Sequence, residues 1–319
     1  MTRAAPPTGP LRSDVWLLCL GVLCGSAGGP LAAVVVVASG FAVAFWRLLA
    51  GTVFALPLGI ARAKEITGAG RKTVLLSMSA GCLLAFHFVA FMTSVGLTSV
   101  ASATALINSQ IVWAAVISRL TGQHISRRAW WGVGIAVAGV ALITGVDFQL
   151  SAQAVTGDFI ALAGGVLGGG YIVTGSHVRK KLSSPTYTLL CYGSGTALLL
   201  PICLISGQQL LGLPLNDWLA ILALTLFAQL IGQNVFNHVL RSIPPTLVSL
   251  GMLFTAPLSA ALAWIFLDQV PPVSAAIGLV VLVLGAALVI SGSLGPPGER
   301  TYRPPGDDPH GGVGVPAGG

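Results

Sequence analysis

Long apolar runs separated by short polar stretches fill the sequence between residues 14 and 292. Each run has about 18–24 residues, enough for an α-helix rising 1.5 Å per residue to cross a hydrocarbon core of about 30 Å. The pattern therefore predicts an all-α integral membrane protein with ten transmembrane helices. The runs cover residues 14–37, 41–62, 73–96, 99–120, 128–145, 157–178, 185–206, 217–240, 244–267 and 272–292.

The eighth run carries an unusual concentration of polar side chains in its second half. At 3.6 residues per turn, Gln229, Gln233 and Asn237 would stack along one line, with Asn234 and His238 on the adjoining line. A carboxamide buried in lipid without partners costs several kcal/mol. This face is therefore predicted to look inward, toward polar protein groups or water, and polar side chains at membrane depth usually mark a pathway or binding site.

The overall composition excludes a soluble globular protein. Only 8% of the 319 residues are charged, 55% are hydrophobic, and the mean hydropathy is +0.89. The five cysteines all lie in apolar runs without the spacing of metal ligands, so we interpret them as small core hydrophobes. We expect no metal and no cofactor.

The positive charges are distributed asymmetrically between the predicted loops. Fifteen of the sixteen Lys and Arg residues fall on one side when the predicted helices alternate across the membrane, and Arg47 is the exception. This positive-inside pattern predicts that both termini are cytoplasmic in the inner or plasma membrane. The basic loops are expected to contact membrane lipid headgroups rather than nucleic acid, despite the formal charge of +7.

The two halves of the chain resemble each other. Asp14 followed by Gly-Val-Leu at 21–23 recurs as Asp158 followed by Gly-Val-Leu at 165–167. Likewise, Ala-Leu-Ile-Thr-Gly at 141–145 corresponds to Leu-Val-Ile-Ser-Gly at 288–292. Because each half contains five predicted helices, the second must enter the membrane from the opposite side. This is the inverted repeat from which many secondary transporters are built, with the substrate site between the halves.

The predicted organisation follows from this duplication. It comprises a cytoplasmic N-terminal tail at 1–13, a first repeat at 14–145, an extracytoplasmic linker at 146–156, a second repeat at 157–292 and a disordered cytoplasmic tail at 293–319. The first run is longer than the apolar part of a usual signal peptide, so we expect it to be retained.

Several short motifs resemble the EamA-type members of the drug/metabolite transporter superfamily. They are Gly25-Ser26, Trp46-Arg47, the stretch NHVLRSIPPTLVSL at 237–250, and Thr-Ala-Pro at 255–257. The resemblance covers roughly residues 14–292, and the spacing, duplication and topology carry it together. It implies transport of a small metabolite, often export of an amino acid or related compound, through a cavity between two repeats.

The sequence departs from that family at three places. It has Gly122-Gln123 and Asp268-Gln269 where members often have Gly-Glu, and Gln110 replaces a frequent proline. The first two departures suggest that those turns are structural, and Gln110 is a candidate for a specific substrate contact.

The fourth run is interrupted by Asn108-Ser109-Gln110, which the repeat aligns with Thr255 and Pro257. These polar groups either join helices by hydrogen bonds or line the cavity. Pro257 frees the carbonyl of Leu253 for a ligand or a neighbouring hydroxyl, or simply kinks the helix.

Two residues inside apolar runs can carry a positive charge. His87 is the titratable residue closest to the predicted centre, and it either packs in the core or carries a proton during transport. Arg47 either reaches the outer interface, pairs with helix carbonyls, or faces an anionic substrate group. Without proton coupling, facilitated diffusion is the alternative.

Together these arguments predict a secondary transporter for a small polar metabolite, acting as a monomer or homodimer. The predicted substrate contacts are His87, Asn108, Gln110, Gln233, Asn237 and Thr255, with Tyr171, Ser26 and Arg47 as further candidates. The rival interpretation is a polytopic membrane enzyme, or a subunit that handles lipid or quinone. No catalytic motif is visible in the sequence, so we expect no enzymatic activity.

Overall fold

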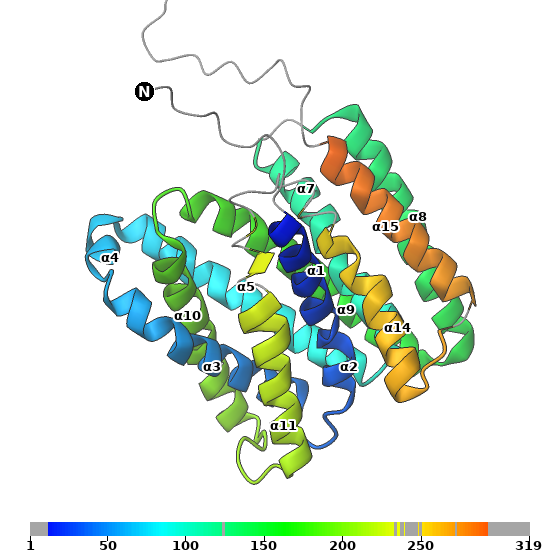
Figure 1. Ribbon diagram of the computed structural model, residues 1–319, viewed down its shortest axis with the longest axis horizontal. Coiled ribbons are helices and arrows are strands. Elements are labelled where there is room, and N and C mark those ends of the chain that lie inside the picture. Colours follow the sequence, from blue (N-terminus) through cyan, green and yellow to red (C-terminus); the bar gives the residue numbers. More distant parts are fainter. Residues whose placement is uncertain are drawn as a thin grey trace, which may run out of the picture.

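The computed structural model describes residues 12–122, 125–232, 235–236, 239, 248, 251–271 and 273–292. These residues are almost entirely helical, and no strand occurs among them (Figure 1). The elements are α1 (Arg12–Ser26), α2 (Gly28–Ala33), α3 (Gly40–Ile60), α4 (Lys64–Gly68), α5 (Arg71–Val95), α6 (Val100–Asn108), α7 (Gln110–Leu120), α8 (Arg127–Leu150), α9 (Ala152–Val178), α10 (Ser184–Ile205), α11 (Leu215–Leu224), the π-helix η1 (Thr225–Gly232), α14 (Thr255–Leu267) and α15 (Val273–Gly292).

Within the described part of the chain, eight helical segments are long and apolar enough to cross a membrane. A ninth apolar segment, Gly251–Leu267, is shorter. The eight segments are Ser13–Ala33, Gly40–Ile60, Arg71–Val95, Val100–Leu120, Ala152–Val178, Ser184–Ile205, Leu215–Gly232 and Ala275–Gly292.

Serine side chains mark where several of these helices begin. Ser39, Ser99 and Ser151 each accept a hydrogen bond from the backbone N–H three residues later, at the starts of α3, α6 and α9. Such caps satisfy one of the four N–H groups that a helix leaves unpaired at its beginning. The short polar stretches between the apolar runs therefore determine the helix starts. α8 ends at Leu150 and α9 begins at Ala152, so both helices extend into the stretch predicted as a linker.

Several of the predicted helices are not continuous α-helices over their described residues. The first run divides at Ala27 into α1 and α2, and the fourth divides at Ser109 into α6 and α7. The eighth changes from α-helix to π-helix at Thr225. The prediction of 3.6-residue stacking along the eighth run is therefore wrong from Thr225 to Gly232, because a π-helix pairs residues five apart and rotates its side chains differently.

Helices from the two halves of the chain pack against each other throughout the bundle. α3 contacts α10, α6 contacts α14, and α8 contacts α15. In addition, α9 lies against α5, α6 and α7, while α1 lies against η1 and α14. Figure 1 shows α8 and α15 side by side at the edge of the molecule, away from α3, α4 and α10.

The interior of the bundle contains small and hydroxyl-bearing side chains beside large apolar ones such as Leu48 and Leu106. Ser77, Thr186 and Ser259 are fully buried, whereas Leu58 and Ile205 are exposed. Large apolar side chains on the outside, together with small residues where helices meet, suit a bundle whose surroundings are lipid, because helices in lipid associate through close backbone approach.

Candidate functional site

The most unusual buried side chain is Arg47 of α3. It is 5% exposed, and its guanidinium carbon lies 4.0 Å from the centre of the Phe88 ring of α5. Neither Nε nor Nη1 has a hydrogen-bond partner, and Arg47 forms no ion pair with any residue that the structure describes. The side chain therefore neither reaches the outer interface nor pairs with helix carbonyls through these two nitrogens.

Gln229 of η1 lies against the same face of α3. Its Nε2 donates a hydrogen bond to the backbone oxygen of Arg47 at 3.2 Å, and its Oε1 is buried without a partner. Gly51 makes room for this contact, because a Cβ there would lie 2.5 Å from both Gln229 Nε2 and Tyr192 Cδ2. Arg47 and Gly51 are one helical turn apart, so η1 and α10 (through Tyr192) close over the turn of α3 that carries the guanidinium.

A second polar group surrounds His87 of α5. Its Nδ1 lies 2.8 Å from the backbone oxygen of Gly164 in α9. Because a carbonyl only accepts, Nδ1 carries the proton in this arrangement and Nε2 holds the lone pair. Gln110 reaches the same place, since a Cβ on Gly168 would lie 2.5 Å from Gln110 Oε1 and 2.7 Å from His87 Nδ1. The structure thus brings together two of the predicted site residues.

Three other predicted residues donate to their own helices. Asn108 Nδ2 donates to the Thr104 oxygen at 2.9 Å, Thr255 Oγ1 to the Met252 oxygen at 2.7 Å, and Ser26 Oγ to the Leu23 oxygen at 2.7 Å. Their oxygens keep lone pairs for further hydrogen bonds. Nearby, the hydroxyls of Thr104 and Ser259 lie 3.4 Å apart between α6 and α14.

The remaining predicted contacts are Tyr171, Gln233 and Asn237. The Tyr171 ring stacks on Tyr187 at a centroid distance of 6.5 Å, within an apolar cluster of α3, α5, α9 and α10 side chains. Gln233 and Asn237 lie outside the described residues, as do Asn234 and His238.

Sequence reasoning missed three residues around Arg47. Gln229 belonged to the predicted polar face but was not selected as a contact, and its position in the eighth run was the signal that could have found it. Phe88 and Tyr192 are aromatic residues in apolar runs, and nothing in the sequence distinguishes them from core residues.

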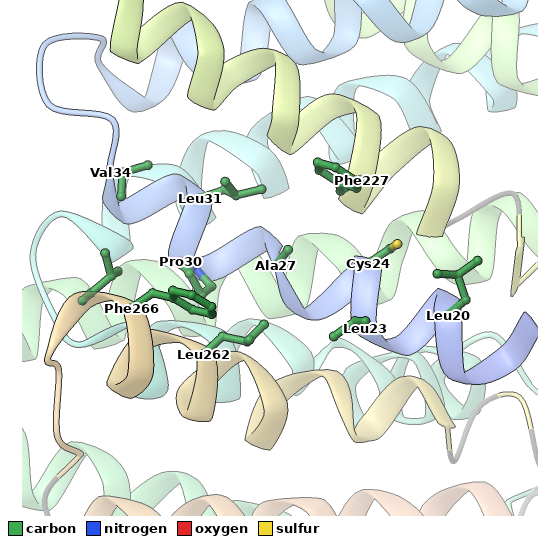
Figure 2. Close-up of a pocket in the computed structure, with 11 residues that line it drawn as sticks. Leu20, Leu23, Cys24, Ala27, Pro30, Leu31, Val34, Phe227, Leu262 and Phe266 are labelled. Carbon is green, nitrogen blue, oxygen red and sulfur yellow. The ribbon is translucent and has the colours of Figure 1, made fainter. Parts of the chain in front are cut away.

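A hollow lined by apolar side chains lies on the side of α1 and α2, between η1 and α14. It has a volume of about 490 Å³, and its lining side chains are shown in Figure 2. Leu23, Phe227 and Phe266 line it together with other apolar residues. A surface without polar groups suits an acyl chain rather than a polar solute.

Two further hollows lie at opposite ends of α5. The first, of about 520 Å³, is lined by Lys72, His177, Lys180 and Lys181 together with threonine and apolar side chains. The second, of about 360 Å³, lies beside the α2–α3 loop and Thr93. Among the residues described, no group of three His, Cys, Asp or Glu side chains could hold a metal ion.

A bundle of apolar helices that encloses an arginine, a histidine and amides, with hollows at both ends, has the organisation of a multi-pass membrane transporter. The profile of the EamA-like transporter family matches residues 12–145 and again residues 155–291. The chain therefore belongs to the EamA-like transporter family.

A curated relative agrees with this assignment, and a solved structure has a similar fold. The chain is 27% identical over 219 residues to an uncharacterized transporter of Archaeoglobus fulgidus (strain ATCC 49558 / DSM 4304 / JCM 9628 / NBRC 100126 / VC-16), a match that covers 68% of this chain and 74% of the relative. A solved structure described as "Crystal structure of protein" matches with a TM-score of 0.60 and 19% identity, over 89% of this chain and 99% of that one. The latter likeness concerns the fold alone. Together, the family and the relative indicate a transporter rather than an enzyme.

Proposed function

We propose that this protein is a secondary transporter that exports a small polar metabolite by alternating access between two oppositely oriented repeats, residues 14–145 and 157–292. Both termini would lie in the cytoplasm. Differential binding of the solute to inward-open and outward-open states would carry it across the membrane.

The pairing of helices is the observation that supports this proposal most strongly. If the halves are related by a twofold axis in the membrane plane, the helices beside that axis should meet their counterparts, as α3 and α10, α6 and α14, and α8 and α15 do. A contact between two helices that do not correspond to each other should recur between their two counterparts. The contact of α5 with α9 recurs as that of η1 with α1, and the contact of α6 with α9 recurs as that of α14 with α1.

One pair of side chains supports the proposed axis. Thr52 of α3 and Thr196 of α10 are separated by 144 residues, the offset of the Asp14 and Asp158 motifs, and their hydroxyls lie 3.2 Å apart. Equivalent residues approach each other this closely only near a symmetry axis. An inverted pair of five-helix repeats accounts for this contact and for the helix pairing together.

The polar groups between the helices supply the candidate pathway. His87 and Gln110 meet at Gly168, and Thr104 of α6 and Ser259 of α14 meet at Gly29 of α2. Asn108, Thr255 and Ser26 lie on α6, α14 and α1. His87 is the candidate proton carrier, because its Nε2 lone pair is available while Nδ1 is held by Gly164.

Release of solutes from liposomes that contain the purified full chain tests the proposal. Vesicles loaded with a mixture of amino acids, hydroxy acids, amides and sugars should release at least one of them faster than protein-free vesicles. Release that speeds up under an imposed pH gradient would indicate proton coupling, and release insensitive to the gradient would indicate facilitated diffusion. A panel that leaks no faster than from protein-free vesicles would contradict a transport function.

A further inference from the structure

We propose that the transported solute carries a carboxylate or an equivalent anionic group, and that Arg47 binds this group in a site completed by Gln229 and Tyr192. This inference rests on the proposed transport function and specifies the chemistry of its substrate. Arg47 offers N–H donors at Nε and Nη1, and Gln229 offers its unpartnered Oε1 to a donor on the same solute.

The charge on Arg47 has no counterpart in the described structure. No described carboxylate forms an ion pair with Arg47, and three of them are engaged elsewhere: Asp217 with backbone N–H groups of the α2–α3 loop, Glu65 with Arg62 and Ser183, and Asp158 with Thr98. An uncompensated charge buried between helices is strongly unfavourable. The contact with the Phe88 ring recovers only part of that cost.

A purely structural role does not fit these contacts. An arginine that joins helices does so through hydrogen bonds to carbonyls or carboxylates, yet the link between α3 and η1 is made by the Gln229 amide and the Arg47 backbone. The guanidinium is not needed for that link. Its N–H groups are therefore reserved for a partner that the folded chain does not supply.

The basic hollow at the beginning of α5 provides an approach for anions. Lys72, Lys180 and Lys181 line it, and they belong to the loops that the positive-inside pattern assigns to the cytoplasm. A cluster of one sign of charge raises the local concentration of the opposite ion. The direction expected for an exporter, from the cytoplasm inward to the site, agrees with this placement.

Access to Arg47 requires that the bundle open. Gln229 and Tyr192 cover the α3 turn of Arg47 and Gly51, and Arg47 is 5% exposed. Separation of η1 or α10 from α3 would uncover the donors, and closure around an anion would satisfy them. The charge of the solute would thereby favour the closed, occluded state.

Flux of chemically matched pairs tests this inference. Liposomes with the full chain are loaded with lactate and lactamide, succinate and succinamide, and leucine and leucinamide, and release is measured by mass spectrometry. The wild type should release at least one acid about tenfold or more faster than its amide. Arg47→Gln should abolish that preference, whereas Arg47→Lys should keep part of it. Arg62→Gln is the matched control, because it removes an exposed arginine just beyond the end of α3.

A second measurement separates the anion site from transport. In detergent, the same acids should raise the Tm of the wild type and leave that of Arg47→Gln unchanged, and the amides should raise neither. Without any solute, Arg47→Gln should melt no lower than the wild type, because an unpaired buried charge has been removed. This result also shows that the variant folds.

The outcomes distinguish the two proposals. Release of acids and amides at equal rates, or an acid preference that survives in Arg47→Gln, would overturn the anion site and leave transport standing. Stabilisation by acids that depends on Arg47, but without any flux, would retain the anion site and contradict transport. The absence of both flux and stabilisation by every acid in the panel would overturn both.

Discussion

Gly51 allows two neighbouring helices to approach α3 closely, because it has no side chain. Two side chains from different helices, Gln229 and Tyr192, occupy the space that any Cβ at this position would need. A helix in lipid approaches its neighbours most closely at such small residues. At Gly51, this closeness places an amide and a phenol ring beside Arg47.

Gly51→Ala should therefore lower flux by about tenfold or more while the chain still folds. The added methyl group must displace Gln229 and Tyr192, and overpacking of this kind costs about 1–3 kcal/mol. Gly134→Ala of α8 is the matched control, because a Cβ there meets nothing within 4 Å. Equal flux in the two variants would show that the contact between η1 and α3 has no role in transport.

Glu65 provides a residue-scale prediction about pH. The backbone N–H of Ser183 donates to Glu65 Oε2 at 2.9 Å, and this hydrogen bond lowers the pKa of the carboxyl below its ordinary value of 4.5. A lowered pKa means that the interaction stabilises the fold above the unfolded pKa and is lost as the pH falls through the folded one. The difference in Tm between wild type and Glu65→Gln should be present at neutral pH, shrink as the pH falls below the ordinary pKa of 4.5, and vanish below the lowered pKa of the folded state. A difference that grew on acidification would contradict this assignment.

At the scale of elements, the α2–α3 loop is held by a single carboxylate. Asp217, at the start of α11, accepts hydrogen bonds from the backbone N–H groups of Val36, Val37 and Ala38 at 3.2, 2.8 and 2.8 Å. It is 2% exposed. Three charge-assisted bonds converge on one side chain, so α11 and the loop behave as one unit.

Asp217→Asn should loosen this loop, because an amide presents one acceptor oxygen in place of two charged ones. We expect the loop to open more readily by about 1–3 kcal/mol, seen as faster amide hydrogen exchange at residues 36–38. Asn216→Ala is the control, because the neighbouring Asn216 is exposed. Unchanged exchange in Asp217→Asn would mean that the loop is held by other contacts.

The positions of the elements follow from the apolar pattern more closely than the details of the site do. The predicted runs 41–62 and 185–206 correspond to α3 (Gly40–Ile60) and α10 (Ser184–Ile205), because a helix in lipid must be apolar over a fixed length. The π-helix was not predictable in this way. Its sequence, TLFAQLIG, also fits an α-helix, and the choice between them depends on packing against α1 and α3.

The same distinction applies to the candidate site. The sequence identifies Arg47 as the one Lys or Arg far from the ends of an apolar run, but which groups it faces depends on contacts between distant helices. Phe88 and Tyr192 reach it from α5 and α10, and no local pattern encodes that meeting. His87 and Gln110 were selected as polar residues in apolar runs, and the small residue Gly168 is what lets them converge.

At the scale of the whole molecule, two interactions in which a carboxylate holds a loop correspond to each other. Glu65, between α3 and α5, holds the loop between α9 and α10, whereas Asp217, at the start of α11, holds the loop between α2 and α3. The two interactions are equivalent under the proposed repeat, because the α3–α5 connection corresponds to the α10–α11 connection and the α9–α10 loop corresponds to the α2–α3 loop. In the proposed arrangement the loop held by Glu65 faces the cytoplasm and the loop held by Asp217 faces outward, so each side of the membrane has one loop fixed by a carboxylate.

This correspondence makes a direct prediction about topology. Thr67 follows α3 in the first half, and Gln209 follows α10 in the second half, so they occupy corresponding connections and both are exposed. In inverted repeats, such connections must lie on opposite faces of the membrane. In intact cells, a membrane-impermeant maleimide should therefore label Gln209→Cys but label Thr67→Cys only after permeabilisation. The parent chain serves as the blank, because its five cysteines all lie within α1, α5 and α10.

The two possible failures of that labelling experiment have different meanings. Labelling of Thr67→Cys alone in intact cells would reverse the orientation derived from the positive charges and keep the inverted relation. Labelling of both variants from one side would show that the halves enter the membrane in the same direction. The helix pairing and the Thr52–Thr196 contact would then need another explanation, because a parallel repeat has no twofold axis in the membrane plane to bring equivalent helices together.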